Sequence, residues 1–252
     1  MIETALLKFL PWDSAFFGKR IGQVLASPLK EDEFREAIRM ASAENLDCLY
    51  FLCDSADPES AGIAESNDFH LVDIRVTKEV LLSDKPGAEP QWDQTRVRLA
   101  LPGDLPALKA IAGVAHTYSR FYYDRNFDRS RASELFELWI EKSCNGWAQA
   151  VFAAVHQGRA VGYLSCHQDE PRLGRIGLAA VGREAQGRGV GTALMQAALA
   201  WFRQQGVSRA TVVTQGRNIG AQRLYEQSGF VTSSIQLWYH GWKPFGRESL
   251  RR

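Results

Sequence analysis

The chain reads Gln186-Gly187-Arg188-Gly189-Val190-Gly191-Thr192 directly after an apolar, strand-like run that ends at Val181. After this stretch, apolar residues recur at helical spacing as far as about Gln205, and Gly206 is typical of a residue that ends a helix. The order is therefore a strand, a glycine turn and a helix, which indicates an α/β arrangement in this part of the chain.

The glycine turn is suited to a phosphate ligand. Backbone N–H groups in the first turn of a helix lack intrahelical partners, and the helix dipole adds partial positive charge there. Glycines let the backbone approach an anion closely, and Arg188 can add a charge-assisted contact. The turn lacks the Lys-Ser/Thr ending of a nucleotide triphosphate loop, and its spacing differs from that of the dinucleotide turn. Taken alone, the glycines could also serve only to pack the helix closely against the strand.

A second motif runs from Asn218 to Phe230, after a strand-like run at 210–214. Asn218 is placed to cap a short helix, on which Ala221, Leu224 and Tyr225 share one side. The triplet Ser-Gly-Phe ends that helix. Together, the two motifs resemble the GNAT acyltransferase superfamily. The Q-x-x-G-x-G turn and the N-x-x-A-x-x-x-Y…G-F pattern fall on Gln186, Gly189, Gly191, Asn218, Ala221, Tyr225, Gly229 and Phe230.

The resemblance covers about residues 96–240 and implies a fold and a cofactor. The implied fold is a mixed, twisted sheet with flanking helices, which splays before the glycine turn so that the pantetheine arm of acetyl-CoA lies in the opening. Acetyl-CoA is the implied co-substrate, and Tyr225 is the implied catalytic residue that protonates the departing thiolate. Core packing is the alternative role for this tyrosine. The implied cofactor-binding residues are Ala179, Ala180, Val181, Gln186, Gly187, Arg188, Gly189, Val190, Gly191, Thr192 and Asn218.

The general base is left open by the sequence. Many members of the superfamily carry a glutamate on the strand before the glycine turn, whereas Arg175 stands near that place here. The replacements considered are His116, His167 and Asp169, acting directly or through water. A lone histidine is more often a hydrogen-bonded structural residue, so none of the three is assigned.

An aromatic-rich stretch at 116–127 suggests the acceptor, because rings can stack on a base and arginines can fork onto phosphate. A loop that tucks its rings into the core is the alternative. The stretches at 12–18, 119–121 and 138–140 resemble the bacterial dTDP-fucosamine acetyltransferases, which implies a nucleotide-linked amino sugar of the dTDP-4-amino-4,6-dideoxygalactose type as acceptor. The predicted acceptor-binding residues are Arg120, Phe121, Tyr122, Tyr123 and Arg175.

Two domains are expected, because prolines, glycine and charges gather at 83–94 between two apolar strands. We predict a smaller N-terminal α/β domain at 1–90 and a GNAT acetyltransferase domain at 95–242. The first should hold strands near 22–25, 48–53 and 71–82, with helices at 30–44 and 58–66. In the second, Asp104 should cap a helix that runs to about Ala115, and another helix should span 129–142. Strands are expected near 96–101, 150–155, 160–167 and 176–181, with a hairpin turn at 156–159.

Bulk composition narrows the function classes. The 30 basic and 29 acidic residues give a formal net charge of +1, which favours neither nucleic acid nor a membrane surface as partner. No apolar run reaches the roughly 20 residues that cross a bilayer, and the N-terminus does not read as a signal peptide. Four cysteines are too few for a disulfide framework, and no metal site is expected. We therefore expect a reduced, cytoplasmic protein.

Two other functions stay open at this point: a GNAT acetyltransferase for another small-molecule or protein amine, and a non-catalytic acyl-CoA-binding sensor. An intact Tyr225 beside an intact glycine turn disfavours the sensor. The acyl chain length and the identity of the acceptor amine are not fixed by the sequence. A homodimer is considered, but the oligomeric state is left open.

Overall fold

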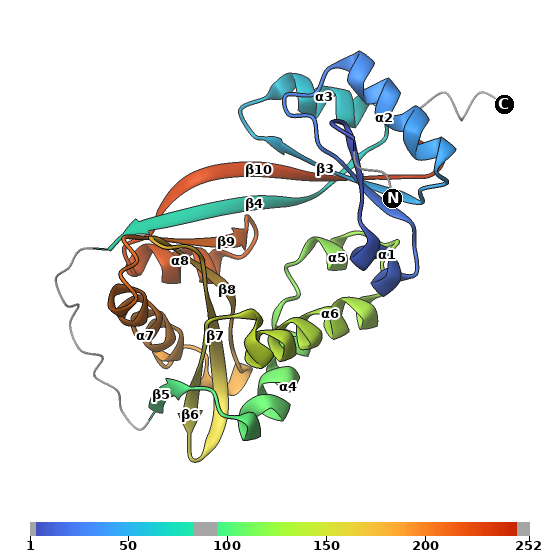
Figure 1. Cartoon of the computed structure of the whole chain (residues 1–252). Coiled ribbons are helices and arrows are strands. Elements are labelled where there is room, and N and C mark those ends of the chain that lie inside the picture. Colours follow the sequence, from blue (N-terminus) through green and yellow to red (C-terminus); the bar gives the residue numbers. More distant parts are fainter. Residues whose placement is uncertain (1–3, 83–94, 246–252) are drawn as a thin grey trace.

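The computed structural model describes residues 4–82 and 95–245, whose strands form one ten-stranded mixed sheet (Figure 1). The strand order is β1-β2-β3-β10-β4-β9-β8-β7-β6-β5. The strands are β1 (Leu7–Phe9), β2 (Ile21–Val24), β3 (Cys48–Asp54), β4 (His70–Leu81), β5 (Thr95–Leu99), β6 (Ala150–His156), β7 (Arg159–Glu170), β8 (Leu173–Val181), β9 (Arg209–Gln215) and β10 (Val231–Trp242). The helices are α1 (Pro11–Phe17), α2 (Glu31–Ala43), α3 (Pro58–Ser66), α4 (Leu105–Ala115), α5 (Arg120–Tyr123), α6 (Arg129–Lys142), α7 (Val190–Gln204) and α8 (Ile219–Gln227). The predicted mixed α/β sheet with flanking helices is confirmed.

Most elements lie within a few residues of their predicted bounds. Both α3 and α6 have the expected limits, and the hairpin between β6 and β7 turns on Gln157 and Gly158. The φ angles of these two residues, 48° and 78°, are the left-handed values that a two-residue turn of this type needs. The elements β1, α1, α5 and β10 were not predicted. The predicted linker at 83–94 lies outside the described residues.

Asp104 stands at the start of α4, as predicted, but its side chain does not cap that helix. Its carboxylate instead accepts hydrogen bonds from the backbone N–H of Leu101 (2.7 Å) and from Arg98 of β5 (2.6 and 3.0 Å). A bidentate, charge-assisted contact between arginine and carboxylate is stronger than a neutral capping hydrogen bond. The hydrogen bond with Arg98 also lowers the pKa of Asp104. The aspartate therefore ties β5 to the turn before α4.

The sheet joins the two halves of the chain through β10. This strand runs antiparallel to β3 on one side and to β4 on the other, and β4 also pairs with β9. The last strand of the chain is thus inserted between two strands of its first part, as the long paired ribbons in Figure 1 show. The division at 1–90 and 95–242 remains a prediction, because one sheet continues across both parts.

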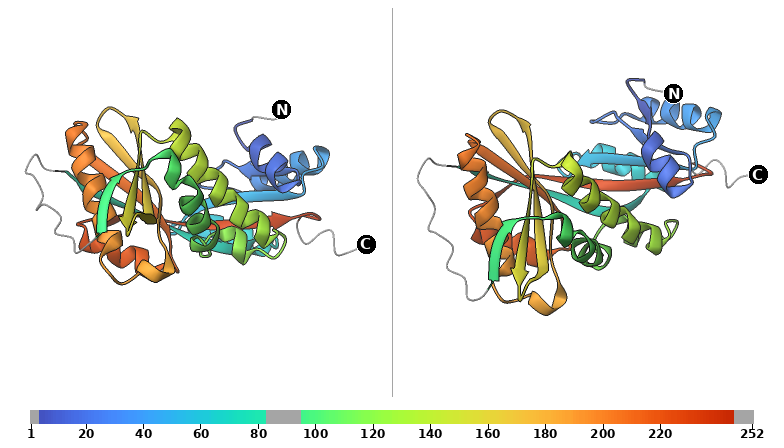
Figure 2. Two further views of the ribbon diagram at one scale, coloured as in Figure 1. Left: turned by 90° about the horizontal axis from the view of Figure 1, so that it is seen from below. Right: turned by 60° about the horizontal axis from the view of Figure 1, so that its bottom comes forward.

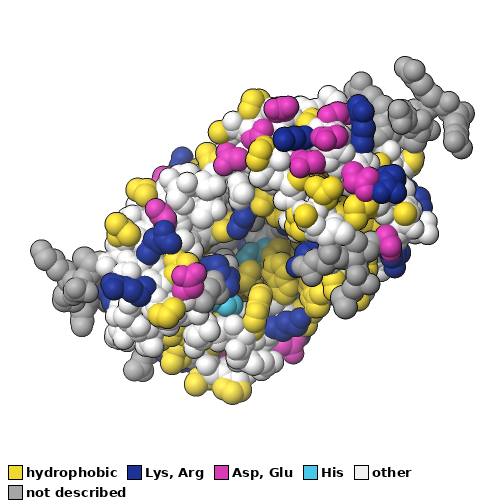
Figure 3. All heavy atoms as spheres, turned by 45° about the horizontal axis from the view of Figure 1, so that its top comes forward, with side chains coloured by type: hydrophobic (Ala, Val, Ile, Leu, Met, Phe, Trp, Pro, Cys, Tyr) yellow, Lys and Arg dark blue, Asp and Glu magenta, His cyan; other side chains and the backbone are white. Residues whose placement is uncertain are grey.

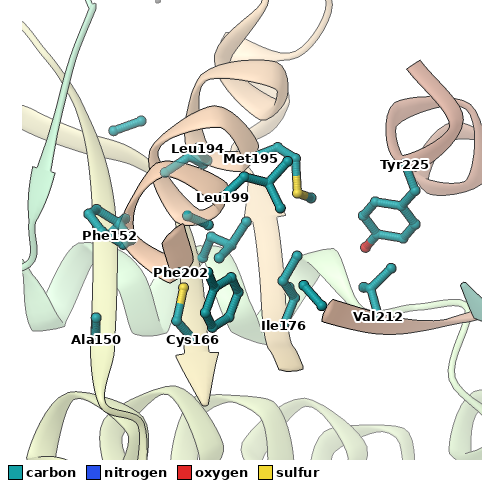
Figure 4. Packing of buried hydrophobic residues seen from close by; sticks show 14 of the residues in the cluster. Ala150, Phe152, Cys166, Ile176, Leu194, Met195, Leu199, Phe202, Val212 and Tyr225 are labelled. Carbon is teal, nitrogen blue, oxygen red and sulfur yellow. The ribbon is translucent and has the colours of Figure 1, made fainter. Parts of the chain in front are cut away.

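Helices cover both faces of the sheet (Figures 1 and 2). On one face, α7 packs Leu194, Met195 and Phe202 into a core with β6, β7, β8 and β9, and α8 adds Tyr225 (Figure 4). On the opposite face, α4 and α6 form a second core with β6 and β7. Around β3 and β10, α2 and α3 cover one side, while α1, α5 and α6 meet the other through aromatic rings. The sheet thereby separates two groups of helices, and α4 and α5 lie on the face opposite α7.

The remaining expectations about composition concern cysteines, metals and membranes. Cys48, Cys53 and Cys166 are buried free thiols. Within residues 4–82 and 95–245, no cluster of three or more His, Cys, Asp or Glu side chains is arranged for a metal ion. Across the same residues, no helix combines the length and the apolar character that a bilayer crossing requires.

Candidate active site

Two glycines shape the turn before α7. Gly187 and Gly189 have φ angles of 73° and 78°, which glycine adopts without the penalty that a Cβ brings. In the described part of the chain, no heavy atom lies within 4 Å of the place where a Cβ would stand on Gly187, so open space adjoins the backbone there. Gly189 is the N-cap of α7, and it has no side chain to cap the helix. The N–H groups of the first turn of α7 are therefore suited to an anion.

The sheet splays at β8, as the resemblance implied. The parallel pairing of β8 with β9 begins at Leu173 and ends where Ile176 faces Val212, although β8 continues to Val181. A register shift between β7 and β8 lies at the same level, and the Ser165 hydroxyl there accepts a hydrogen bond from the Leu178 N–H at 2.8 Å. Among the described strands, the last residues of β8 therefore have no partner on the β9 side. Their backbone groups on that side are available to a ligand.

A pocket of about 520 Å³ fills this opening and brings most of the predicted cofactor-binding residues together. Gln186 closes the turn, because its side-chain amide donates to the Val181 carbonyl at 3.0 Å. Arg188 is a predicted residue that is not in the pocket lining. The sequence did not indicate Leu164, Tyr163 or Gln215, which reach the pocket from β7 and β9. The lining from the predicted set comprises Ala179, Ala180, Val181, Gln186, Gly187, Gly189, Val190, Gly191, Thr192, Asn218 and Tyr225.

The second motif supplies the opposite wall of the pocket. The Asn218 side chain accepts from the Ala221 N–H at 3.2 Å and so caps α8, as predicted. Tyr225 is 5% exposed, and burial raises its pKa to about 12. In Figure 4 its hydroxyl points away from α8, toward the strands where Ile176 and Val212 form the last β8–β9 pair. At neutral pH this hydroxyl therefore remains protonated and can donate a hydrogen bond into the opening.

His116 and Tyr163 form a polar pair in the pocket wall. The His116 Nε2 and the Tyr163 hydroxyl are 2.8 Å apart, and the imidazole stacks on Phe136 at 4.4 Å. Burial lowers the pKa of His116 to about 4, so its imidazole is neutral at neutral pH. His116 directly follows α4 and Tyr163 lies in β7, so the two residues are far apart in the sequence. Only tertiary contact could identify it.

The other candidates for the base have different surroundings. His167 is 3% exposed and packs against Trp147. A Cβ on Gly177 would stand 2.5 Å from the His167 Nε2, so the strand backbone covers this ring. The Asp169 side chain is outside the described part of the structure. Arg175 is half-buried in β8, between His167 of β7 and Thr211 of β9.

Arg120 is held by three aromatic rings. Its guanidinium lies 4.7 Å from the ring centre of Tyr50, 4.5 Å from that of Phe121 and 4.3 Å from that of Trp238. Tyr50 and Trp238 belong to β3 and β10, so strands from both ends of the chain fix this side chain. The Arg120 Nε is buried and has no hydrogen-bond partner among the described residues.

The other predicted acceptor residues of α5 differ in exposure. Phe121 is 4% exposed and packs among neighbouring phenylalanine rings. The Tyr122 hydroxyl is 2.8 Å from that of Ser133. Tyr123 is 50% exposed, and the Arg217 guanidinium lies 3.7 Å from its ring centre. Tyr123 is thus the exposed member of this segment, whereas Arg120 and Tyr122 are half-buried and Phe121 is buried.

One pocket is thus bordered by a splayed strand, by a glycine turn at a helix N-terminus and by a capped second helix. Residues 112–230 match the model of the Acetyltransferase (GNAT) family. Residues 112–230, just under half of the chain, therefore carry a GNAT acetyltransferase domain, and the members of this family use acetyl-CoA.

The relatives with substantial sequence similarity include proteins of sugar metabolism. The chain is 31% identical over 142 residues to the spore coat polysaccharide biosynthesis protein SpsD of Bacillus subtilis, covering 56% of this chain and 48% of that protein. It is 32% identical over 139 residues to a dTDP-fucosamine acetyltransferase of Escherichia coli, covering 54% and 59%. The match to a mycothiol acetyltransferase of Saccharomonospora viridis is longer but weaker, with 24% identity over 241 residues, 88% of this chain and 74% of the relative. The chain thus spans about half the length of the first two relatives.

Solved structures extend the likeness in fold to nearly the whole chain. A GCN5-related N-acetyltransferase from Sphaerobacter thermophilus has a TM-score of 0.62 at 17% identity, covering 94% of this chain and 76% of that one. A protein of unknown function from Staphylococcus epidermidis has a TM-score of 0.64 at 15% identity, covering 95% and 92%. At such identities the likeness concerns the fold alone.

Proposed function

We propose that this protein transfers the acetyl group of acetyl-CoA to the amine of a nucleotide-linked amino sugar, by direct attack of the amine on the thioester. One observation carries the acyl-CoA part of the proposal. A single pocket joins the unpaired end of β8, the open glycine turn and Tyr225. The end of β8 would hold the extended pantetheine arm, the glycine turn would hold the pyrophosphate, and Tyr225 would supply a proton.

The cofactor would be held by groups at two ends of the pocket. The backbone at 179–181 would meet the pantetheine amides, and the amides of the turn at 187–192 would meet the pyrophosphate. Gly187 fits this role, because a side chain there would fill the open space beside the turn, where the phosphate would lie. When bound, acetyl-CoA supplies an activated acetyl group with a thiolate leaving group.

The transfer needs a neutral amine, stabilisation for the carbonyl oxygen and a proton for sulfur. Tyr225 would supply the proton, since its hydroxyl is protonated and lines the pocket. His116 is the candidate from the sequence that also lines the pocket, and as a neutral imidazole it can accept a proton. Tyr163 would orient it through the 2.8 Å contact. The amine proton would thereby leave on the α4 side of the pocket.

The acceptor class rests on the relatives and on Arg120. Two relatives above 30% identity are named for polysaccharide biosynthesis and for dTDP-fucosamine acetylation. An arginine held by rings of Tyr50 and Trp238 offers a fixed positive charge for a phosphate group. The mycothiol acetyltransferase relative favours a second candidate, an amine on a small molecule without a nucleotide.

A screen of amines separates these candidates. Purified protein with acetyl-CoA is incubated with dTDP- and UDP-linked amino sugars, free amino sugars, thiol-bearing amino sugar conjugates and peptides, and thiol release is recorded. Preferred turnover of a nucleotide-linked amino sugar supports the proposal. Preferred turnover of an amine without a nucleotide replaces it by the second candidate. Binding of acetyl-CoA without turnover of any amine indicates a sensor.

A further inference from the structure

A row of polar side chains crosses the sheet beside the cofactor pocket. In the strand register, Arg75 of β4 faces Gln215 of β9 on one side and Gln236 of β10 on the other. Gln215 lines the pocket, and directly opposed residues in antiparallel strands have Cα atoms roughly 4.5 to 5.5 Å apart. Arg75 therefore stands one strand away from the pocket.

The positive charge of Arg75 lacks a carboxylate partner among residues 4–82 and 95–245. Its side chain instead donates to a neutral group, from the Arg75 Nη1 to the Gln236 Oε1 at 2.9 Å. Burial and the nearby charge of Arg120 lower the pKa of the Arg75 guanidinium. Two guanidinium groups thus repel each other in a half-buried place, which costs free energy unless an anion joins them.

Arg120 also lacks a carboxylate partner among the described residues. Its contacts are the three aromatic rings, and no carboxylate of the described residues lies within ion-pair distance of its guanidinium. The positive charge of Arg120 acts on the carboxyl groups of Asp13 and Asp73. Burial nevertheless raises the pKa values of both carboxyl groups. Asp73 is already engaged by Arg217 at 3.3 Å. Asp124, at the end of α5, is engaged by His240 at 2.7 Å and by Trp242 at 2.8 Å. Arg75 and Arg120 are thus two guanidinium groups without a carboxylate in ion-pair contact among the described residues.

We infer that Arg75 and Arg120 together bind the phosphate or diphosphate end of the acceptor, and that this anion site is shared between β4 and α5. The inference rests on the proposed function and adds a residue from the first part of the chain to it. Figure 3 shows one face hollowed near its centre, with several basic side chains around the hollow. A sugar ring bound between this site and the pocket would present its amine to the thioester while its nucleotide end contacts the arginines.

The inserted strand β10 contacts both arginines. The strand carries Trp238, which stacks on Arg120, and Gln236, which accepts from Arg75. One strand thus fixes the direction of both guanidinium groups. Without β10 between β3 and β4, the two arginines would not share a partner strand.

The test compares Arg75→Gln and Arg120→Gln with Arg39→Gln, a control on the exposed face of α2. The first measurement is the binding of dTDP by calorimetry to protein saturated with CoA, so that the glycine turn is already occupied. We expect each of the two variants to weaken dTDP binding by about 10- to 150-fold, the usual effect of losing one charge-assisted hydrogen bond. The control should bind dTDP and CoA as the wild type does.

The second measurement is kcat/KM for a dTDP-linked amino sugar and for an amino sugar without phosphate. The variants should lose about 10- to 150-fold with the first acceptor and less than about 3-fold with the second. Unchanged dTDP binding and kcat/KM in both variants would overturn the inference while leaving the proposed function in place. If the wild type turns over only amines without a nucleotide, the acceptor class itself is wrong. Melting temperatures decide whether a loss reflects unfolding, and all binding and rate measurements are made well below the melting temperature of each variant, because Arg120 also packs on three rings.

Discussion

Replacement of Gly189 by valine tests whether the glycine turn holds the cofactor. Gly189 has a φ of 78°, and adopting the left-handed region costs a residue with a Cβ about 1 to 2 kcal/mol. Valine should sit at the upper end of this range because it is β-branched. The substitution therefore creates backbone strain at this position. The turn should relax away from its left-handed φ and tilt its amides.

The expected loss of affinity follows from those amides. One charge-assisted hydrogen bond contributes about 1.5 to 3 kcal/mol, which corresponds to about 10- to 150-fold in the dissociation constant. We therefore expect Gly189→Val to raise the Kd for CoA, measured by calorimetry, by at least about 10-fold. The cofactor pocket itself should persist, because the core side of α7 is unchanged.

Gly206→Val is a matched control at the other end of α7. Gly206 has a φ of 74°, and among the described residues no heavy atom lies within 4 Å of the place where its Cβ would stand. The valine there carries the same strain without contact with the pocket. Both variants should lower the free energy of unfolding by about 1 to 2 kcal/mol in urea titrations. Only Gly189→Val should weaken CoA binding. Equal CoA affinity in the two variants, whether both are weak or both are normal, would refute the reasoning.

Two further predictions concern the groups that move protons. Tyr225→Phe should lower kcat by about 10²- to 10⁴-fold with little change in CoA affinity, since a positioned general acid is lost; a wild-type kcat in single-turnover experiments would remove this residue from the mechanism. His116 and His240 have folded pKa values of about 4, below the unfolded value of about 6.5, so their contribution to stability is present above pH 6.5 and lost as the pH falls toward 4. The raised pKa of Asp73, about 6, acts in the opposite direction, because its protonated form is favoured in the folded state. The free energy of unfolding of His116→Gln should therefore fall less than that of the wild type between about pH 6.5 and 5, and identical slopes in urea titrations would contradict the assignment.

The sheet that joins the two halves explains why the acceptor side is harder to predict than the cofactor side. The cofactor pocket is formed mainly by two local motifs, each a short stretch of sequence. The neighbourhood of Arg120 depends instead on Tyr50, Trp238 and Arg75, which come from three distant strands. A sequence pattern near Arg120 could indicate its aromatic neighbours in α5 but not these partners.

The sequence by itself determined the strand, turn and helix around Gly189 and the capped helix after Asn218, because left-handed glycines, capping side chains and apolar periodicity act over a few residues. It also determined that this region resembles a GNAT domain. Tertiary structure alone decided where β8 separates from β9, where β10 enters the sheet and which side chains meet Arg120. These features depend on pairing and packing between segments far apart in the chain, for which no local pattern of residues specifies the partner.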